Sequence, residues 1–299
     1  MILELICCDY CGCKNYKTRY RKPDNWLWLN QFEYPVVECL NCGLVYLNPR
    51  PTQNSMGLFY PDNYHEQRNS DSFKFRYTIQ CEYLSPLTDH NVLDIGCARG
   101  DFLAFLKNKY PNISTVGLDY FSTKVDYDFI DFYNLKLPDS NFSSFSFDLI
   151  TAWAVFEHLH DPGAHFEEVY RILKDRGKFV FLVTNSESLY GKCAYTEDIP
   201  RHTFHFSEKT LKNYANKYNF SEVNFFYETR LWDSTGTGTF YYKLMEIFGS
   251  SWEKRYLRLD NKIQKLAGIF GKFLDKLIFS FNWESRKNKS GILIAEFIK

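Results

Sequence analysis

The residues best suited to chemistry surround a turn of three small residues, Gly96, Ala98 and Gly100. Residues 92–95 before them form a short apolar segment that predicts a buried strand, and a helix is predicted after them. Small residues let a ligand lie against the backbone, and the first N–H groups of the helix point toward that ligand. Asp94 adds a carboxylate, which suits a nucleoside with a cationic or amino-acid end. The small residues are too closely spaced for the dinucleotide fingerprint Gly-x-Gly-x-x-Gly.

A second acid, Asp119, follows the next apolar segment, residues 114–118. An acid about twenty residues beyond such a turn is placed to accept hydrogen bonds from the two hydroxyls of a ribose. The turn and Asp119 together therefore predict a nucleoside cofactor. The alternative interpretation is that Asp119 caps a helix.

Two histidines are candidate proton acceptors, since a neutral imidazole can remove a proton from a hydroxyl or an activated carbon. His158 follows residues 147–153, the predicted fourth strand, and Glu157 precedes it directly; His202 lies in the loop after the predicted fifth strand. We expect His158 to be the base, because it follows its strand directly, and His202 to be its rival. Glu157 would orient the substrate or a neighbouring loop. The alternative is that Glu157 and His158 cap the helix that begins near Pro162.

The first fifty residues hold six of the nine cysteines. Two Cys-x-x-Cys-Gly segments each fold two thiolates back toward one point, and two such pairs supply the ligands of a closed, structural zinc site. The four predicted ligands are Cys8, Cys11, Cys39 and Cys42. Cys7 and Cys13 are rival ligands, and a set of unrelated buried or redox-active cysteines is the alternative. Residues 16–21 and 33–38, between the two pairs, predict the strands of a hairpin.

The elements that must position these groups alternate between strands and helices. The predicted strands are residues 92–95, 114–118, 128–132, 147–153, 178–184, 222–229 and 291–297. Helices are predicted at residues 73–84 and 162–173. Only residues 121–126 are available for a helix between the second and third strands, which is little more than a turn. Gly177 predicts a break in the chain before the fifth strand.

The order of these motifs resembles that of class I S-adenosylmethionine-dependent methyltransferases. The resemblance implies an α/β fold with a Rossmann-like, seven-stranded sheet, an N-terminal zinc ribbon and a C-terminal helical insertion. It also implies that an acid at the end of the third strand meets the adenine amino group; Asp131 fits best and Asp128 is the alternative. The implied cofactor-binding residues are Asp94, Gly96, Ala98, Gly100, Asp119, Tyr120, Asp131, Phe132, Ala152 and Trp153.

Three further segments sharpen the resemblance: Asn-Pro-Arg-Pro from Asn48, Tyr-Pro-x-x-Tyr from Tyr60, and Pro-Arg-His-x-x-x-Phe from Pro200. Together with the cysteine pairs they are similar to a bacterial methyltransferase family that modifies sugars and other small metabolites, including nucleotide-linked keto sugars. The resemblance implies that Tyr60 and Tyr64 approach the substrate and that Arg201 holds an anionic group such as a nucleotide phosphate. The alternatives are that the tyrosines pack the linker and that hydrogen bonds tie down the loop of Arg201.

The charge balance restricts the partners. Lys and Arg number 36, as do Asp and Glu, so the formal net charge is zero and nucleic acid is not the expected partner. We expect a small-molecule substrate, and a nucleotide sugar is one candidate. The first residues do not form a signal peptide, and no stretch approaches the ~20 apolar residues of a membrane span. A cytoplasmic protein with reduced thiols is therefore predicted.

Residues 236–289 separate the last two predicted strands and predict a helical insertion. One helical face carries Leu259, Ile263, Leu266, Phe270, Phe273 and Leu277. Residues 252–279 contain seven Lys or Arg against three Asp or Glu. Such a helix can lie on a membrane surface, but a lid over the substrate or a homodimer contact is the use we favour. The predicted parts of the chain are a zinc ribbon (1–50), a linker with a helix (51–90), a cofactor-binding domain (91–235), the insertion (236–289) and the last strand (290–299).

The predicted function is methyl transfer from S-adenosylmethionine to an oxygen or carbon atom of a sugar or glycan precursor. One alternative is a methyltransferase acting on a lipid-linked or quinone acceptor at a membrane surface. The other is a catalytically silent homologue that binds the cofactor or a partner. The spacing of the small residues disfavours a dehydrogenase.

Overall fold

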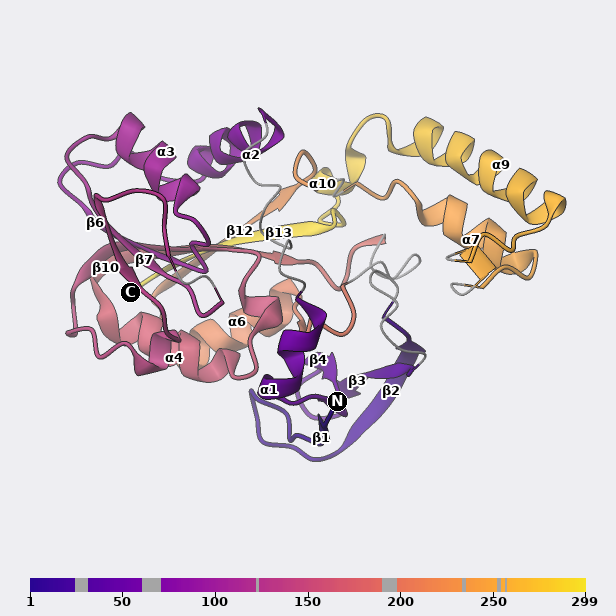
Figure 1. The fold of residues 1–299 in the computed structure, drawn as a ribbon, viewed down its shortest axis with the longest axis horizontal. Coiled ribbons are helices and arrows are strands. Elements are labelled where there is room, and N and C mark those ends of the chain that lie inside the picture. The colour runs from indigo at the N-terminus through magenta and orange to yellow at the C-terminus, as the bar shows by residue number, and fades with distance from the viewer. Residues whose placement is uncertain are drawn as a thin grey trace. The chain divides into compact units, whose positions relative to one another are not determined.

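Figure 1 shows the fold of the chain in a computed structural model. The structure describes residues 1–24, 32–60, 71–121, 124–189, 198–232, 235–251, 254–255 and 257–299. The chain forms two compact units. The first unit comprises Met1–Phe59, Thr184–Glu208 and Phe226–Leu293, and the second comprises Tyr60–Val183, Lys209–Phe225 and Ile294–Lys299.

A seven-stranded sheet has the strand order β12-β13-β10-β9-β6-β7-β8. Its strands are β6 (Asn91–Ile95), β7 (Ser114–Leu118), β8 (Ile130–Tyr133), β9 (Phe147–Trp153), β10 (Leu173–Thr184), β12 (Glu222–Glu228) and β13 (Ile292–Ile298). The five strands from β10 to β8 pair in parallel. Parallel strands buried on both faces are nearly continuous apolar runs, and β9 and residues 179–183 of β10 have that composition. The predicted Rossmann-like, seven-stranded sheet is confirmed.

The helices α2 (Asp71–Glu82), α3 (Asp101–Lys109), α4 (Pro162–Ile172) and α6 (Glu208–Lys217) accompany this sheet. Phe166 of α4 is fully buried, with its ring centroid 5.7 Å from that of Phe181 in β10 and 5.9 Å from that of Phe297 in β13. Phe179 stacks on Phe181 at 4.4 Å. Much of the aromatic content of the second unit therefore fills the interior beside the sheet.

The fifth strand differs from its predicted bounds. Instead of beginning after a break at Gly177, β10 begins at Leu173 and contains a register shift before Lys178. Arg176 has a positive φ of 61° and donates its N–H to the Lys299 carbonyl, and the Gly177 carbonyl accepts the N–H of Lys299. These hydrogen bonds let the predicted turn remain within the strand as a bulge. Between β7 and β8 the described residues contain no helix.

A four-stranded antiparallel sheet with the order β11-β4-β3-β2 lies in the first unit. Its strands are β2 (Tyr16–Lys22), β3 (Tyr34–Cys39), β4 (Val45–Leu47) and β11 (Phe204–His205). The short strands β1 (Leu3–Glu4) and β5 (Arg50–Pro51) pair beside it, and α1 (Gln53–Met56) and η1 (Gly57–Phe59) follow. The predicted hairpin between the two cysteine pairs is confirmed, and a distant segment, β11, completes its sheet.

The insertion between β12 and β13 contains α7 (Thr239–Ile247), α9 (Lys262–Phe279) and α10 (Trp283–Arg286). The predicted helical insertion is thus confirmed in the described residues. Among those residues, no helix combines the length and the apolar character needed to cross a membrane.

Candidate active site

The turn between β6 and α3 has the backbone that its small residues predict. Gly96, Ala98 and Gly100 have positive φ angles of 72°, 50° and 87°. A Cβ atom on Gly96 would lie 2.5 Å from the Val155 side chain, and one on Gly100 would lie 2.6 Å from the Ile130 side chain. The positive φ angles favour glycine at both positions, and at Gly96 the Val155 side chain also leaves little room for a Cβ atom. The turn forms a backbone cradle at the start of α3.

Asp119 follows β7 directly, and its carboxylate hydrogen-bonds to the backbone of this turn. Its Oδ2 atom accepts the N–H of Ala98 at 2.9 Å, and its Oδ1 atom accepts the N–H of Phe121 at 2.8 Å. The side chain is buried. These two bonds fix the orientation of the carboxylate beside the turn.

Asp94 is buried at the end of β6, where its Oδ1 atom accepts a hydrogen bond from the Thr151 hydroxyl at 2.7 Å. Burial raises the pKa of Asp94 to about 7, because the surroundings disfavour its charge; the Thr151 hydrogen bond opposes this shift and the charge of Asp119 adds to it. A cation bound nearby would favour the ionised form of Asp94.

Trp153 ends β9 with an unsatisfied polar atom. Its indole Nε1–H is buried and finds no hydrogen-bond partner among the described residues. The ring packs edge-on against Phe102 of α3, with 5.3 Å between the centroids. A buried donor without a partner costs about 1–3 kcal/mol, which an acceptor atom of a ligand would recover. Ala152, the preceding residue, pairs with Ile95 at the end of β6. The cradle and this donor together fit a nucleoside ligand.

The end of β8 differs from the prediction. Tyr133 pairs with Leu118 at the carboxyl ends of β8 and β7, so the strand ends one residue later than expected. Asp131 and Phe132 therefore lie within β8, with Asp131 two residues before its end, and their contact with the adenine stays a prediction. The residue just beyond the strand is Asn134, whose amide donates to the Asp119 carbonyl at 2.9 Å.

Asn134 also donates to the Tyr120 carbonyl at 3.2 Å. It was missed because the predicted strand was shifted by one to two residues; its place directly after an apolar strand is the signal that could have identified it. Tyr120 is exposed, and its ring lies 5.2 Å from both the Phe121 ring and the Lys136 ammonium.

His158 lies in η3 (Phe156–His158), close after β9, and its Nδ1 atom is 3.0 Å from the Tyr60 hydroxyl. The Tyr60 ring stacks on Phe121 at 4.8 Å. Because the Phe121 N–H bonds to Asp119, a chain of contacts connects the predicted ribose-binding acid to the predicted base. This pairing of Tyr60 with His158 was not predicted. Tyr64, the second tyrosine of the segment, lies outside the described residues.

Glu157 is fully buried in η3. The N-cap residue of α4 is Asp161, whose side chain makes no capping hydrogen bond. Neither Glu157 nor His158 is therefore the N-cap residue of α4.

Arg201 and His202 lie in the first unit, near β11. Arg201 is fully buried; its Nε donates to Asp198 at 2.6 Å, and one terminal nitrogen donates to the Phe59 carbonyl at 3.1 Å. Asp24 forms a further buried ion pair with Arg201 at 3.5 Å. The backbone N–H of His202 donates to the Asp198 carbonyl at 2.7 Å. These are the contacts of a loop held by its own interactions, the second of the two interpretations given above.

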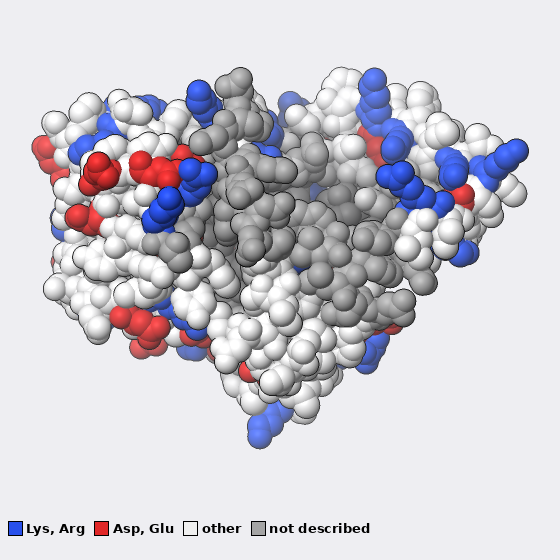
Figure 2. Space-filling view, viewed as in Figure 1, with Lys and Arg blue, Asp and Glu red and all other residues white. Residues whose placement is uncertain are grey.

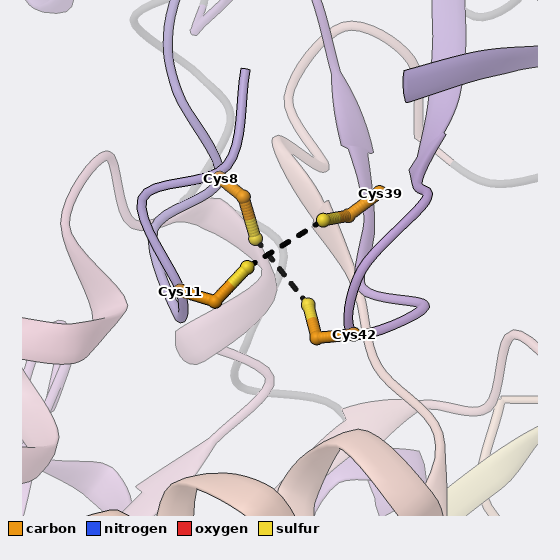
Figure 3. Close-up of side chains that lie close together, drawn as sticks. All are labelled: Cys8, Cys11, Cys39 and Cys42. Atoms are coloured by element: carbon orange, nitrogen blue, oxygen red, sulfur yellow. Dashed lines mark hydrogen bonds between the residues drawn. The ribbon is translucent and has the colours of Figure 1, made fainter. Parts of the chain in front are cut away.

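The four predicted zinc ligands converge in the first unit (Figure 3). The Sγ atoms of Cys8 and Cys42 are 3.5 Å apart, and those of Cys11 and Cys39 are 3.6 Å apart. Four sulfurs at about 2.3 Å from one tetrahedral ion would be about 3.8 Å apart. The cluster therefore has the size of a four-thiolate metal site. Of the rivals, Cys7 is exposed, and the Cys13 sulfur accepts the N–H of Asn15 at 3.4 Å.

Comparisons with known proteins bear on this site. Residues 65–224 match the model of a family described as "Methyltransferase domain". No curated protein matches the sequence. A Haloferax volcanii structure of the Trm112 methyltransferase activator in complex with a methyltransferase is 18% identical, with a TM-score of 0.52, over 79% of this chain and 96% of that chain. A SAM-dependent methyltransferase from Thermotoga maritima is 15% identical, with a TM-score of 0.50, over 81% of this chain and 98% of that chain. These two likenesses concern the fold alone.

Proposed function

The chain belongs to the family of methyltransferase domains, and on that basis we propose that it methylates an oxygen or carbon atom of a small molecule, a sugar or glycan precursor. The enzyme class is that of S-adenosylmethionine-dependent methyltransferases. The observation that carries the assignment of the cofactor site is the cradle of Gly96, Ala98 and Gly100 with Asp119 bonded to its backbone.

S-adenosylmethionine supplies an electrophilic methyl group on a positively charged sulfonium. In this proposal Asp119 accepts the ribose hydroxyls, and the cradle lets the cofactor lie on the start of α3. Asp94 supplies the negative charge on the cationic side of the ligand. Trp153 donates its unsatisfied N–H to an acceptor of the bound molecule. The protein then has to position the acceptor in line with the methyl group and remove its proton.

We assign proton removal to His158. A neutral imidazole carries one N–H and one lone pair. If Nδ1–H donates to the Tyr60 hydroxyl oxygen, the lone pair lies on Nε2, where it can accept the proton of the substrate. Tyr60 thus becomes a residue that orients the base. His202 remains the rival base, and Glu157 would orient the substrate or a neighbouring loop.

We also propose that Cys8, Cys11, Cys39 and Cys42 bind one structural zinc ion. The support is the convergence of the four sulfur atoms and the two glycines that close the cysteine segments, Gly12 and Gly43, with positive φ angles of 69° and 81°. A closed site of four thiolates has no open position for a substrate.

Replacing Asp119 by alanine should weaken binding of S-adenosylmethionine by tenfold or more. Each hydrogen bond to a charged group contributes about 1.5–3 kcal/mol, and two ribose hydroxyls would lose their acceptor. Calorimetric titration measures the affinity, with Asp139→Ala, an exposed acid at the end of η2 (Leu137–Asp139), as the matched control. Unchanged affinity in Asp119→Ala would reject this site.

The affinity should rise with pH because a bound cation requires Asp94 to be ionised. Below the Asp94 pKa of about 7, Asp94 must lose its proton before the cation binds, which weakens the apparent affinity. Above this pKa, Asp94 is already ionised and the affinity is not reduced. Between about pH 6 and about pH 8 the expected gain is up to about tenfold. Titration across this range should give a rising profile for the native protein and a flat one for Asp94→Asn. A native profile that is flat or falls with pH would contradict the role of Asp94.

The lipid-linked or quinone acceptor is the second candidate. The exposed apolar side chains of α9 and the exposed lysines beside them favour it. Chromatographic identification of the methylated product separates it from a sugar acceptor. Cofactor binding without turnover on any cell extract would instead favour the catalytically silent homologue.

A further inference from the structure

The helices α7 and α9 of the insertion pack side by side (Figure 1). A Cβ atom on Gly271 of α9 would lie 2.6 Å from the Cα of Tyr241 in α7, so the two backbones approach closely. Asp275 accepts the N–H of Tyr241 at 3.0 Å at the start of α7, and Gln264 donates to the Phe248 carbonyl at 3.1 Å at its end. The face of α9 that carries these small and polar residues is therefore committed to α7.

The large apolar side chains of α9 lie on the other side of the helix. They form what we term the α9 face: Ile263, Leu266, Ile269, Phe270, Phe273 and Leu277. Each of them is at least 56% exposed. At 3.6 residues per turn, these positions occupy about one third of the circumference, and the residues packed on α7 occupy a separate third. Such a continuous exposed apolar surface marks an interaction site.

The exposed charged side chains of α9 are all lysines. Lys265, Lys272 and Lys276 are exposed and fall between the α9 face and the side packed on α7. The single acid of α9, Asp275, is buried and bonded to the N-terminus of α7. In Figure 2, Lys and Arg predominate over Asp and Glu on the visible surface over α7 and α9. A partner that covers the α9 face would therefore meet a row of lysines, of which Lys272 also lies over the Tyr241 ring of α7 at 5.0 Å.

The lysines beside the α9 face favour an anionic lipid surface over a second copy of the chain as its partner. A second copy pairing antiparallel through its own α9 face would bring two rows of lysines together, and α9 offers no exposed acid to neutralise them. An anionic bilayer offers both an apolar layer and negative headgroups, which lysines beside an embedded apolar face can reach. We propose that the α9 face docks on an anionic lipid surface, with Lys265, Lys272 and Lys276 at the headgroups. This proposal does not depend on which acceptor is methylated.

Co-sedimentation of the full chain with vesicles tests the proposal. The protein should bind vesicles of phosphatidylcholine mixed with phosphatidylglycerol and should bind vesicles of phosphatidylcholine alone far more weakly. Phe270→Ser should lower the partition coefficient by about tenfold or more. Phe75→Ser in α2 is the matched control, since Phe75 and Phe270 are both 56% exposed, and it should leave binding unchanged. Replacing Lys265, Lys272 and Lys276 together by glutamine should lower binding to the anionic vesicles on the order of 100-fold.

Other results would overturn the proposal. These are no binding to anionic vesicles, equal binding to both kinds of vesicle, or an equal loss in Phe270→Ser and Phe75→Ser. Light scattering after gel filtration adds an independent readout. If the native protein is a dimer and Phe270→Ser is a monomer, a second copy covers the α9 face. Because every substituted side chain is exposed, circular dichroism should show all variants folded.

Discussion

His158→Ala should lower kcat by about 100- to 10,000-fold and leave the affinity for S-adenosylmethionine unchanged. This is the usual cost of losing a general base, since the substrate must then lose its proton without help. His158 bonds to the Tyr60 hydroxyl, and other residues form the cradle, so we expect cofactor binding not to depend on His158. Steady-state kinetics and calorimetric titration measure the two quantities separately.

Two variants calibrate this result. Tyr60→Phe keeps the aromatic stack on Phe121 but removes the hydroxyl that lies against Nδ1, so it should lower kcat by less than His158→Ala does. His202→Ala should chiefly raise the KM of the substrate. If His202→Ala lowers kcat while His158→Ala changes only KM, the two roles are reversed. If neither histidine variant slows turnover tenfold, no histidine acts as the base.

Removal of zinc should unfold the cysteine-rich segment and spare cofactor binding. Structural zinc contributes about 10–16 kcal/mol in small zinc domains, more than the core of a ribbon this size can replace. Hydrogen exchange after chelation should accelerate in β2, β3 and β4 and also in β11, which pairs with β4. The affinity for S-adenosylmethionine should stay close to its original value, because the cradle belongs to the other compact unit.

Two cysteine substitutions test the same prediction, one inside the four-cysteine cluster and one outside it. Cys39→Ser removes a buried member of the cluster and should lose the metal, whereas Cys13→Ser removes a neighbouring cysteine outside the cluster and should keep it. Elemental analysis of protein purified without chelator should return one zinc per chain. A metal-free but folded native protein would reject the zinc site.

The parts of the site that the sequence predicted correctly are local in the chain. The positive φ angles at Gly96 and Gly100 follow from small residues between an apolar strand and a helix. Each Cys-x-x-Cys segment likewise turns at its own glycine, Gly12 or Gly43. The pairing of β2 with β3 then brings the two segments together across 28 to 34 residues.

The parts that were missed depend on residues far apart in sequence. Tyr60 and His158 are separated by 98 positions, and Arg201 meets Asp24 across 177 positions. No spacing rule connects such pairs. The end of β8 was misplaced for a related reason, because its register is set by pairing with β7 and not by its own composition.

In the insertion, the helical spacing of apolar residues identified the apolar face of α9 but not what that face contacts. Apolar residues at helical spacing are usually expected to pack on the protein's own core. In α9 the side packed on α7 is instead the one with Gly271 and Asp275, because small residues allow the closest approach of two helices. The apolar positions therefore remain exposed, which the spacing alone did not predict.

The central claim is methyl transfer from S-adenosylmethionine to a small molecule. The most direct measurement is incubation of the purified protein with methyl-labelled S-adenosylmethionine and the small-molecule and lipid fractions of a cell extract, followed by identification of the labelled product. We predict label on an oxygen or carbon atom of a sugar or glycan precursor, with the signal lost in Asp119→Ala. Label that appears only in nucleic acid or protein, or no label under conditions in which the cofactor binds, would contradict the account.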